Sequence, residues 1–237
     1  MWGRRSKVTR IGSLWPRFWL QFSGLGPIGR LVTRLAIIGA PPHSARKYLA
    51  GLTAQGFISP DADVYHADVT VGSHVFVDDR ALIFQGDGGG RVELGDRVSL
   101  YRDVILQTGL GGSITIGART GVHPGCQIMA LVAPISIGCG VGIGAGSALY
   151  SYDHGMTPEQ DIFEQALQSK GPIKIGDGAW LGTRVIVLSG VTIGKGAVIG
   201  AGSVVTHDIP ERAIAMGTPA RVVKMREEVV MEGLGNG

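Results

Sequence analysis

His154 has the residue type and position to do acid–base chemistry. It lies in the segment 151–156, directly before a 20-residue interruption at 155–174 that breaks the rhythm of the surrounding chain. Neutral imidazole titrates close to physiological pH, so it can take the proton of an attacking hydroxyl group as a general base. On that evidence alone, a single histidine beside a loop is more often a surface residue than a catalyst.

The chain on both sides of His154 repeats every six residues. The repeats fall into six blocks, and each block contains three six-residue repeats, which we call sixes. Every six begins with Val, Ile or Leu, at Val71, Val77, Ile83, Leu94, Leu100, Leu106, Ile116, Val122, Ile128, Ile137, Ile143, Leu149, Ile175, Leu181, Val187, Ile193, Ile199 and Val205. The second residue of every block is glycine, and the fifth residue of each six is usually small. A short strand that bends every sixth residue needs one inward apolar side chain per side and little bulk at the bend.

This repeat predicts the fold. Three sixes close one triangular coil, and successive coils stack at about 4.8 Å by parallel strand pairing. A doubly wound α/β fold would need helices of roughly 10–15 residues between its strands, and residues 57–210 leave room for one short helix at most. We therefore predict an all-β parallel β-helix over 57–210 with an excursion loop at 155–174, a basic, partly helical segment at 1–56, and a C-terminal extension and cap at 211–237.

Composition excludes several classes of protein. The 237 residues are 44% hydrophobic and only 17% charged, which excludes a charge-rich disordered chain. Two cysteines, Cys126 and Cys139, can form neither a disulfide framework nor a four-cysteine zinc site, and we expect both to serve packing. No apolar run approaches the ~20 residues that span a bilayer.

The positive charge is concentrated at the N-terminal end. Residues 1–60 carry nine Lys or Arg and no acid, together with Trp2, Trp15 and Trp19. The rest of the chain is acidic on balance, so we expect no nucleic-acid partner. A short helix is predicted over Leu25–Ile38. Two roles are open for the segment: peripheral contact with an anionic membrane, and a cap on the first coil of the rod.

The stretch 137–224 resembles the hexapeptide-repeat acyltransferases, in particular the galactoside, maltose and xenobiotic O-acetyltransferases and the related surface-polysaccharide O-acetyltransferases. The matching motifs, in order, are Ile175-Gly176, Trp180-Leu181-Gly182, Gly200–Thr206, Asp208-Ile209-Pro210 and Gly217–Arg221. The resemblance implies a left-handed coil, acetyl-CoA as the donor and a homotrimer with active sites between neighbouring rods. It also implies that His154 is the general base.

The resemblance extends to binding residues. It places Trp180 near the thiol of coenzyme A, Thr183 and Ala201 along the pantetheine arm, Thr206 beyond them, and Arg221 and Lys224 near the nucleotide phosphates. Candidate acceptor residues are Tyr152, Asp153 and His123, the last facing His154 of a neighbouring subunit. Asp153 could instead orient His154 or bind only backbone N–H groups. Gly125 stands where the sugar acetyltransferases commonly have asparagine, so acceptor recognition does not carry over.

Three other functions were weighed. The γ-class carbonic anhydrases use the same rod with three zinc-binding histidines, two of them five residues apart, and no such pair exists among the six histidines here. We therefore predict no metal. A non-catalytic scaffold and N-acetylation of an amino sugar or other small amine remain alternatives. The favoured prediction is a cytoplasmic, acetyl-CoA-dependent O-acetyltransferase acting on a surface polysaccharide or its sugar precursor. Peripheral contact with the inner face of the membrane stays open as one of the two roles of residues 1–56.

Overall fold

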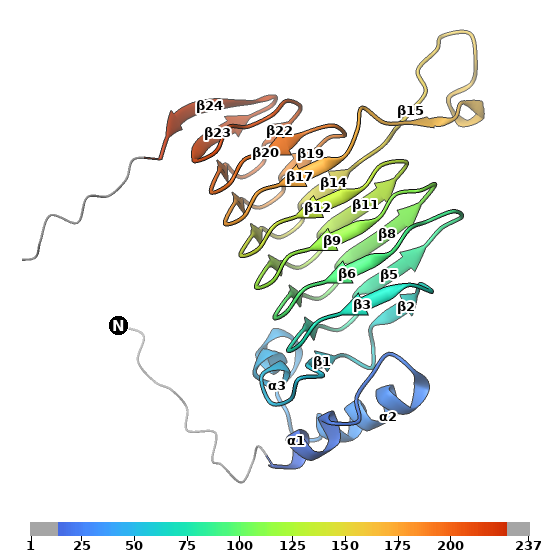
Figure 1. Ribbon diagram of the computed structural model, residues 1–237, viewed down its shortest axis with the longest axis vertical. Coiled ribbons are helices and arrows are strands. Elements are labelled where there is room, and N and C mark those ends of the chain that lie inside the picture. Colours follow the sequence, from blue (N-terminus) through green and yellow to red (C-terminus); the bar gives the residue numbers. More distant parts are fainter. Residues whose placement is uncertain (1–13, 227–237) are drawn as a thin grey trace, which may run out of the picture.

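The computed structural model describes residues 14–226, and these form a rod of stacked triangular coils with a helical cap at one end (Figure 1). Residues 1–13, which include Trp2, and 227–237 lie outside the described part of the chain. Within it, no helix has the length and apolar character needed to cross a membrane.

Three sheets form the walls of the rod. Sheet A consists of β1 (Phe57–Ile58), β4 (Phe76–Val77), β7 (Ser99–Leu100), β10 (Gly121–Val122), β13 (Gly142–Ile143), β18 (Trp180–Leu181), β21 (Val198–Ile199), β23 (Ala213–Gly217) and β24 (Ala220–Met225). Sheet B consists of β2 (Asp63–Tyr65), β5 (Leu82–Gln85), β8 (Ile105–Gly109), β11 (Gln127–Leu131), β14 (Ala148–Tyr150), β19 (Ile186–Val187) and β22 (Val204–Val205). Sheet C consists of β3 (Val69–Val71), β6 (Val92–Leu94), β9 (Ile114–Ile116), β12 (Ile135–Ile137), β17 (Ile173–Ile175) and β20 (Thr192–Ile193).

The predicted parallel β-helix is confirmed. Each coil passes from sheet C to sheet A to sheet B, and neighbouring coils pair in parallel, with Leu100 beside Val122 and Val122 beside Ile143 in sheet A. Of the eighteen apolar positions that begin the sixes, all but Val71 are buried, and Val71 packs partly buried against the same core. The predicted small positions, such as Ala81 and Ser147, are buried at the bends.

A helical cap closes the first coil. The helices are α1 (Leu14–Leu20), α2 (Pro27–Ala36), the 3-10 turn η2 (His43–Arg46) and α3 (Lys47–Ala50), and α2 lies within the predicted helix at 25–38. Leu20 and Leu49 pack with Phe57 and Phe76 of the first coils in a separate apolar cluster. The N-terminal segment therefore acts as the cap that a solenoid end requires, whatever else its outer surface binds.

The C-terminal end extends the rod beyond the expected boundary at residue 210. Strand β23 pairs in parallel with β21, so it forms one further edge of sheet A. Strand β24 then folds back antiparallel to β23 and covers that edge. The motif at 217–220 is the turn between these two strands.

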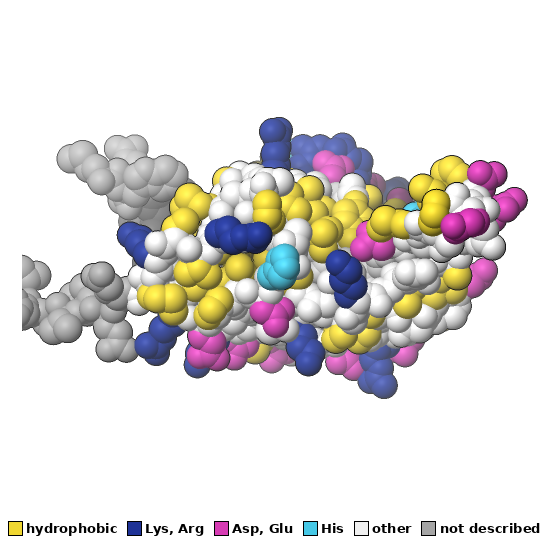
Figure 2. All heavy atoms as spheres, turned by 90° about the horizontal axis from the view of Figure 1, so that it is seen from above, with side chains coloured by type: hydrophobic (Ala, Val, Ile, Leu, Met, Phe, Trp, Pro, Cys, Tyr) yellow, Lys and Arg dark blue, Asp and Glu magenta, His cyan; other side chains and the backbone are white. Residues whose placement is uncertain are grey.

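The predicted excursion leaves the rod between sheets B and C. Strands β15 (Asp153–His154) and β16 (Leu167–Gln168) form an antiparallel ladder at its base, with one short 3-10 turn, η3 (Ile162–Glu164), near its tip. The chain rejoins the wall at β17, so the last two residues of the expected range 155–174 already belong to sheet C. Seen from above, the excursion stands off the rod and carries acidic and apolar side chains at its tip (Figure 2).

Candidate active site

Ser151 fixes the point at which the chain leaves the rod. Its side chain is buried directly after β14, and its hydroxyl donates to the carbonyl oxygens of Ala133 at 2.6 Å and Leu131 at 2.9 Å. These are backbone groups at the end of the previous coil. Because both acceptors belong to the rod, Ser151 anchors the base of the excursion and thereby holds the adjacent β15 in place.

His154 lines a cavity of about 270 Å³ at the base of the excursion. Asp153, Ser169 and Lys170 contribute to the same cavity. The His154 ring meets the ring of Phe163 edge-on, with centroids 6.0 Å apart. Its Nδ1 atom is buried and has no hydrogen-bond partner among residues 14–226. A buried ring nitrogen without a partner costs free energy, so His154 lacks the hydrogen bonds that usually hold a structural histidine.

His66 occupies the equivalent corner four coils earlier and shows the opposite arrangement. Its Nδ1 accepts a hydrogen bond from the Asp68 backbone N–H at 3.1 Å, so the proton sits on Nε2, which lies 3.0 Å from the Thr108 hydroxyl. Burial lowers the pKa of His66. With both nitrogens bonded inside the rod, His66 is structural, whereas Nδ1 of His154 has no partner among residues 14–226.

The two acceptor candidates beside His154 differ in position. Asp153 shares the cavity and pairs with Gln168 across the base of the excursion, but no hydrogen bond joins its carboxylate to the His154 ring. Tyr152 lies outside the lining of that cavity and meets Tyr150 edge-on at 6.0 Å. Burial, together with neighbouring Tyr150 and Asp153, raises the pKa of Tyr152, so its hydroxyl stays protonated and can donate a hydrogen bond.

His123 lies away from His154 within one chain. It follows β10 at the edge between sheets A and B, whereas His154 follows β14 at the edge between sheets B and C. The His123 ring packs on Tyr101 with centroids 5.0 Å apart. The structure therefore places the two histidines at opposite ends of the sheet B strands.

Three of the donor-binding candidates lie on the His123 side. Trp180 on β18 is 56% exposed, and its ring lies against Gly142 of the preceding coil, where an added Cβ would meet it at 3.1 Å. Thr183 and Ala201 are exposed at the edge between sheets A and B on successive coils, next to the hydrogen bond from the Gly202 N–H to the Thr183 carbonyl at 2.9 Å. Together they form an exposed strip along the last coils.

The remaining candidates are more widely spread. Thr206 follows β22 on the edge that His154 occupies two coils earlier, and its hydroxyl lies 2.8 Å from Nδ1 of His207. Arg221 and Lys224 are exposed on β24, beyond the last coil. Within one chain, then, the predicted donor residues surround the end of the rod rather than one cavity.

Comparison with known proteins identifies the family. Residues 172–207 match the family described as "Bacterial transferase hexapeptide (six repeats)". A Staphylococcus aureus (strain MRSA252) protein named "Putative acetyltransferase SAR2635" is 40% identical over 144 residues, which are 60% of this chain and 69% of that protein. The chain belongs to the hexapeptide-repeat acetyltransferase family. Three further S. aureus relatives are covered over 62% of their length.

A solved structure shows the same architecture. A Bacillus cereus protein, described as a "putative acetyltransferase", is 25% identical, and the match covers 70% of this chain and 83% of that one with a TM-score of 0.54. A Vibrio cholerae hexapeptide-repeat acetyltransferase, described as complexed with acetyl coenzyme A, is 34% identical over 48% of this chain and 61% of that one, with a TM-score of 0.46.

Sequence reasoning missed part of the cavity that His154 lines. Gln168, Ser169 and Lys170 reach the His154 cavity on the returning arm of the excursion, and no repeat or motif signals that return. Lys170 adds a positive charge that favours negative charge developing nearby. Tyr101 beneath His123 was also missed, although it occupies the same position one coil earlier and the repeat register would have revealed it.

The cysteines of this acetyltransferase have structural surroundings. Both Cys126 and Cys139 are free thiols. Cys126 is buried in the core, with Sγ 3.1 Å from the Gly144 carbonyl oxygen, and burial raises the pKa of its thiol to about 11. A thiol with that pKa is not a nucleophile at neutral pH, which agrees with the expected packing role.

Proposed function

We propose that the chain transfers the acetyl group of acetyl-CoA to a saccharide hydroxyl, with His154 as general base. The observation that carries the proposal is the buried, unpartnered ring nitrogen of His154 in a cavity at the base of the excursion. The histidine at the equivalent corner, His66, has both nitrogens bonded within the rod. The unpartnered nitrogen of His154 is therefore a feature of the excursion and not of the six-residue repeat.

The reaction requires two proton transfers, one from the acceptor hydroxyl to the imidazole and one from the imidazolium to the leaving sulfur. As the acceptor oxygen attacks the thioester carbonyl carbon, imidazole takes the hydroxyl proton and a C–O bond forms. The tetrahedral intermediate then expels the coenzyme A sulfur as the C–S bond breaks, and imidazolium returns the proton to that sulfur. Lys170, in the same cavity, and backbone N–H groups favour the negative charge on the carbonyl oxygen. The products are an acetyl ester and free coenzyme A.

Coenzyme A would lie along the exposed strip of Trp180, Thr183 and Ala201, with its phosphates toward Arg221 and Lys224. Guanidinium and ammonium groups beyond the last coil suit an anionic nucleotide. This strip lies on the opposite side of sheet B from His154 within one chain. A closed homotrimer would complete the site, because a neighbouring rod can bring its strip and His123 up to the His154 excursion.

A thiol-release assay with purified full-length protein tests the function. Acetyl-CoA is offered with a panel of neutral sugars, nucleotide sugars, glycan fragments and amino sugars, and coenzyme A affinity is measured in parallel. We expect turnover with a hydroxyl acceptor. Turnover with amino sugars alone would overturn the saccharide hydroxyl as acceptor, and absence of both turnover and coenzyme A affinity would favour a scaffold.

Substitution of the base tests its role. His154→Ala should lower turnover about 10²- to 10⁴-fold, the usual contribution of a positioned general base, with unchanged circular dichroism and coenzyme A affinity. His66→Ala is the matched control, because it removes an imidazole from the same corner of another coil, and its turnover should remain near that of the wild type. Near-wild-type turnover in His154→Ala would overturn the assignment.

A further inference from the structure

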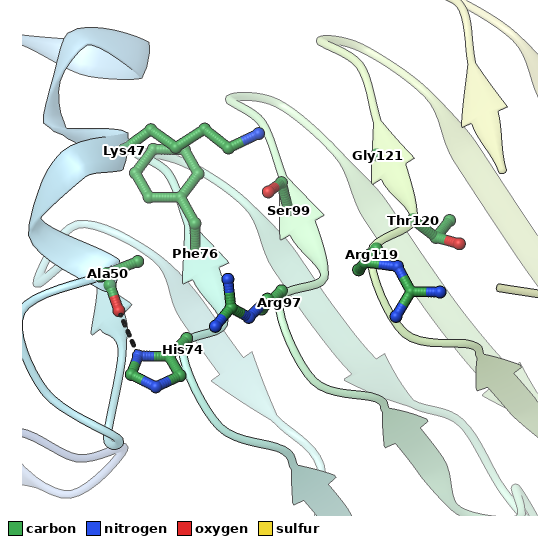
Figure 3. Close-up of a pocket in the computed structure, with 10 residues that line it drawn as sticks. Lys47, Ala50, His74, Phe76, Arg97, Ser99, Arg119, Thr120 and Gly121 are labelled. Carbon is green, nitrogen blue, oxygen red and sulfur yellow. Dashed lines mark hydrogen bonds between the residues drawn. The ribbon is translucent and has the colours of Figure 1, made fainter. Parts of the chain in front are cut away.

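The corner pocket, lined by Lys47, His74, Arg97, Ser99 and Arg119, lies far from the excursion. It occupies about 390 Å³ between α3 and the first coils, at the edge where sheet C turns into sheet A. Figure 3 shows Lys47 reaching over Phe76 towards Ser99, with the Arg97 guanidinium between Ser99 and His74. Three permanent cations thus line one hollow.

The backbone at this corner does not need those side chains. His74, Arg97 and Arg119 take the same left-handed conformation on successive coils, with φ of 58°, 58° and 59°. On the next three coils the equivalent residues are glycines, Gly140, Gly178 and Gly196, and Arg212 ends the column. A residue with a Cβ costs about 1–2 kcal/mol in this conformation. Glycine takes this conformation without that cost on other coils. The presence of basic residues at this position on three successive coils therefore indicates a role other than forming the bend.

These cations lack anionic partners. Among residues 14–226, Lys47, Arg97 and Arg119 form no ion pair with a carboxylate. The Lys47 ammonium donates to the uncharged Tyr101 hydroxyl at 3.0 Å and lies 5.3 Å from the centroid of the same ring. At the next edge of the rod the same backbone position carries Arg80 and, one coil later, Asp103, which bind each other through two hydrogen bonds of 2.7 and 2.8 Å.

One buried hydroxyl of the pocket also lacks a partner, and a histidine ring in it is held in place. Ser99 is 3% exposed, lines the pocket, and its hydroxyl makes no hydrogen bond to the described residues. His74 donates from Nδ1 to the Ala50 carbonyl at 3.1 Å, which fixes the ring and leaves Nε2 as its second polar atom. The pocket therefore combines the fixed ring of His74, the buried hydroxyl of Ser99 and three cationic side chains. This arrangement is a polar pocket rather than a solvated charged surface.

We propose that the corner pocket binds a phosphate-bearing ligand, with a phosphate or pyrophosphate group held by Arg97, Arg119 and Lys47 and the Ser99 hydroxyl. Planar guanidinium groups bind phosphate oxygens through paired hydrogen bonds, and phosphate supplies the missing negative charge. The volume exceeds that of one phosphate group, so the organic part of the ligand also fits. The ligand is either a free phosphorylated molecule or a lipid headgroup that carries phosphate.

Calorimetric titration of the full-length protein with pyrophosphate and with uridine diphosphate tests the pocket. The double variant Arg97→Gln/Arg119→Gln should weaken binding at least about tenfold, the loss expected for charge-assisted hydrogen bonds. Arg80→Gln is the matched control, because it removes an equal arginine charge from the same backbone conformation at the next edge, and its affinity should be unchanged. Binding by neither probe, or equal weakening in all variants, would overturn the proposal.

Two further measurements distinguish a free phosphorylated ligand from a lipid headgroup, and the phosphate pocket from the proposed acetyl transfer. Vesicles of phosphatidylglycerol and phosphatidylcholine offer the phosphate on a lipid, and loss of vesicle binding in the double variant without loss of pyrophosphate binding would overturn a pocket for phosphate. Acetyl transfer to a neutral saccharide should be unchanged in the double variant. That result distinguishes failure of the pocket from failure of the proposed acetyltransferase function.

A second, independent inference concerns the outer face of the cap, which is apolar. The inner sides of α1 and α2 pack on the first coil through residues such as Leu20 and Ala36. The outer sides of these helices and the turns that follow them expose large apolar side chains, namely Leu14, Trp15, Phe18, Phe22, Ile28, Leu31 and Ile38. Seven such residues within 25 positions of one another form more than the scattered apolar exposure of an ordinary surface.

The charges around this face identify its partner. Arg17 on α1 forms no ion pair among residues 14–226, whereas Arg30 and Arg34 on α2 lie 4.0 and 3.5 Å from the carboxylates of Asp63 and Asp61. Residues 1–60 contain no acid. A second copy docked through the same face would bring like charges together, whereas an anionic lipid surface attracts them while the aromatic rings enter the headgroup region. We infer that the outer face of the cap docks on an anionic membrane.

Vesicle sedimentation tests this docking. The full-length protein should bind vesicles that contain phosphatidylglycerol, bind pure phosphatidylcholine much more weakly, and dissociate as salt increases. Phe18→Ser/Leu31→Ser should abolish binding, whereas Phe163→Ser, which removes a fully exposed ring on the excursion, should not. Equal binding by all variants, or a smaller oligomer in the double variant without vesicle binding by the wild type, would overturn the inference.

Discussion

The first three complete coils and the last three have the same interior and different exteriors. Inside, the residues that begin the sixes are buried Val, Ile and Leu in both halves. At the bends, the position after each sheet A strand holds the buried Asp78 and then Tyr101 and His123 in the first half, and glycine at 144, 182 and 200 in the second. The corner between sheets C and A shows the same change from basic residues to glycine.

The comparison separates two constraints on a solenoid. The interior must fill a space that every coil repeats, so its residue types cannot change along the rod. The exterior columns only have to permit the bend, so they can take on separate tasks. In the first half they carry charged and aromatic groups, and in the second half glycine brings successive backbones close together beside Trp180.

The largest effects should show that the interior is equivalent in the two halves. Leu100→Ala and Leu181→Ala each remove a fully buried side chain from sheet A. Both should lower the free energy of unfolding by about 2–5 kcal/mol, because each leaves a cavity in close-packed surroundings. Chemical denaturation of the two variants measures this. A loss of stability confined to one half would show that the core is not continuous.

A smaller effect should distinguish two kinds of glycine in the second half. A Cβ added at Gly182 would approach the backbone N of Ala201 to 2.6 Å, whereas one added at Gly178 meets nothing within 4 Å. Gly182→Ala should therefore cost about 1–3 kcal/mol through overpacking. Gly178→Ala should cost only about 1 kcal/mol, for its left-handed conformation. Thermal unfolding compares them, and equal losses would contradict the distinction.

The smallest effects concern the acidic residues of the first half. Asp78 is buried, and its Oδ2 has no hydrogen-bond partner among residues 14–226. Burial raises the pKa of Asp78, and the hydrogen bond that the Asp79 backbone N–H donates to its Oδ1 opposes the rise. The Asp79 carboxylate adds to the rise, while His43 and Arg46 also oppose it. The folded state thus holds this proton more tightly than the unfolded state, so the contribution of Asp78 to stability is present at acid pH and is lost as pH rises.

Asp78→Asn should therefore gain stability relative to the wild type as pH rises from about 4 to 7, by about 1 kcal/mol, the scale of relieving a buried polar atom without a partner. Asp103→Asn should behave oppositely, because the hydrogen bonds from Arg80 lower the pKa of Asp103 and its contribution is lost as pH falls. Urea unfolding from about pH 2 to pH 7 measures both, because the loss for Asp103 falls below about pH 4 and the change for Asp78 falls above it. Parallel pH profiles for the two variants would contradict the assignment.

The sequence allowed much of this to be predicted. The six-residue rhythm predicted the walls, the core and the excursion, because each depends on local spacing. The return strand β16, which brings Gln168, Ser169 and Lys170 to His154, could not be predicted, because an antiparallel contact inside an insertion leaves no repeat. The corner pocket depends on α3 packing against coils that lie far away in sequence.

The sequence by itself determined the rod, since one apolar residue in every six is enough to specify an inward side chain at each wall. It also determined where the rhythm breaks, and thus which histidine stands apart. Only the tertiary structure decided that His154 keeps an unpartnered nitrogen while His66 does not, and that cations from α3 and two coils share one hollow. Hydrogen-bond satisfaction and the convergence of charges depend on neighbours in space, which residue order alone does not specify.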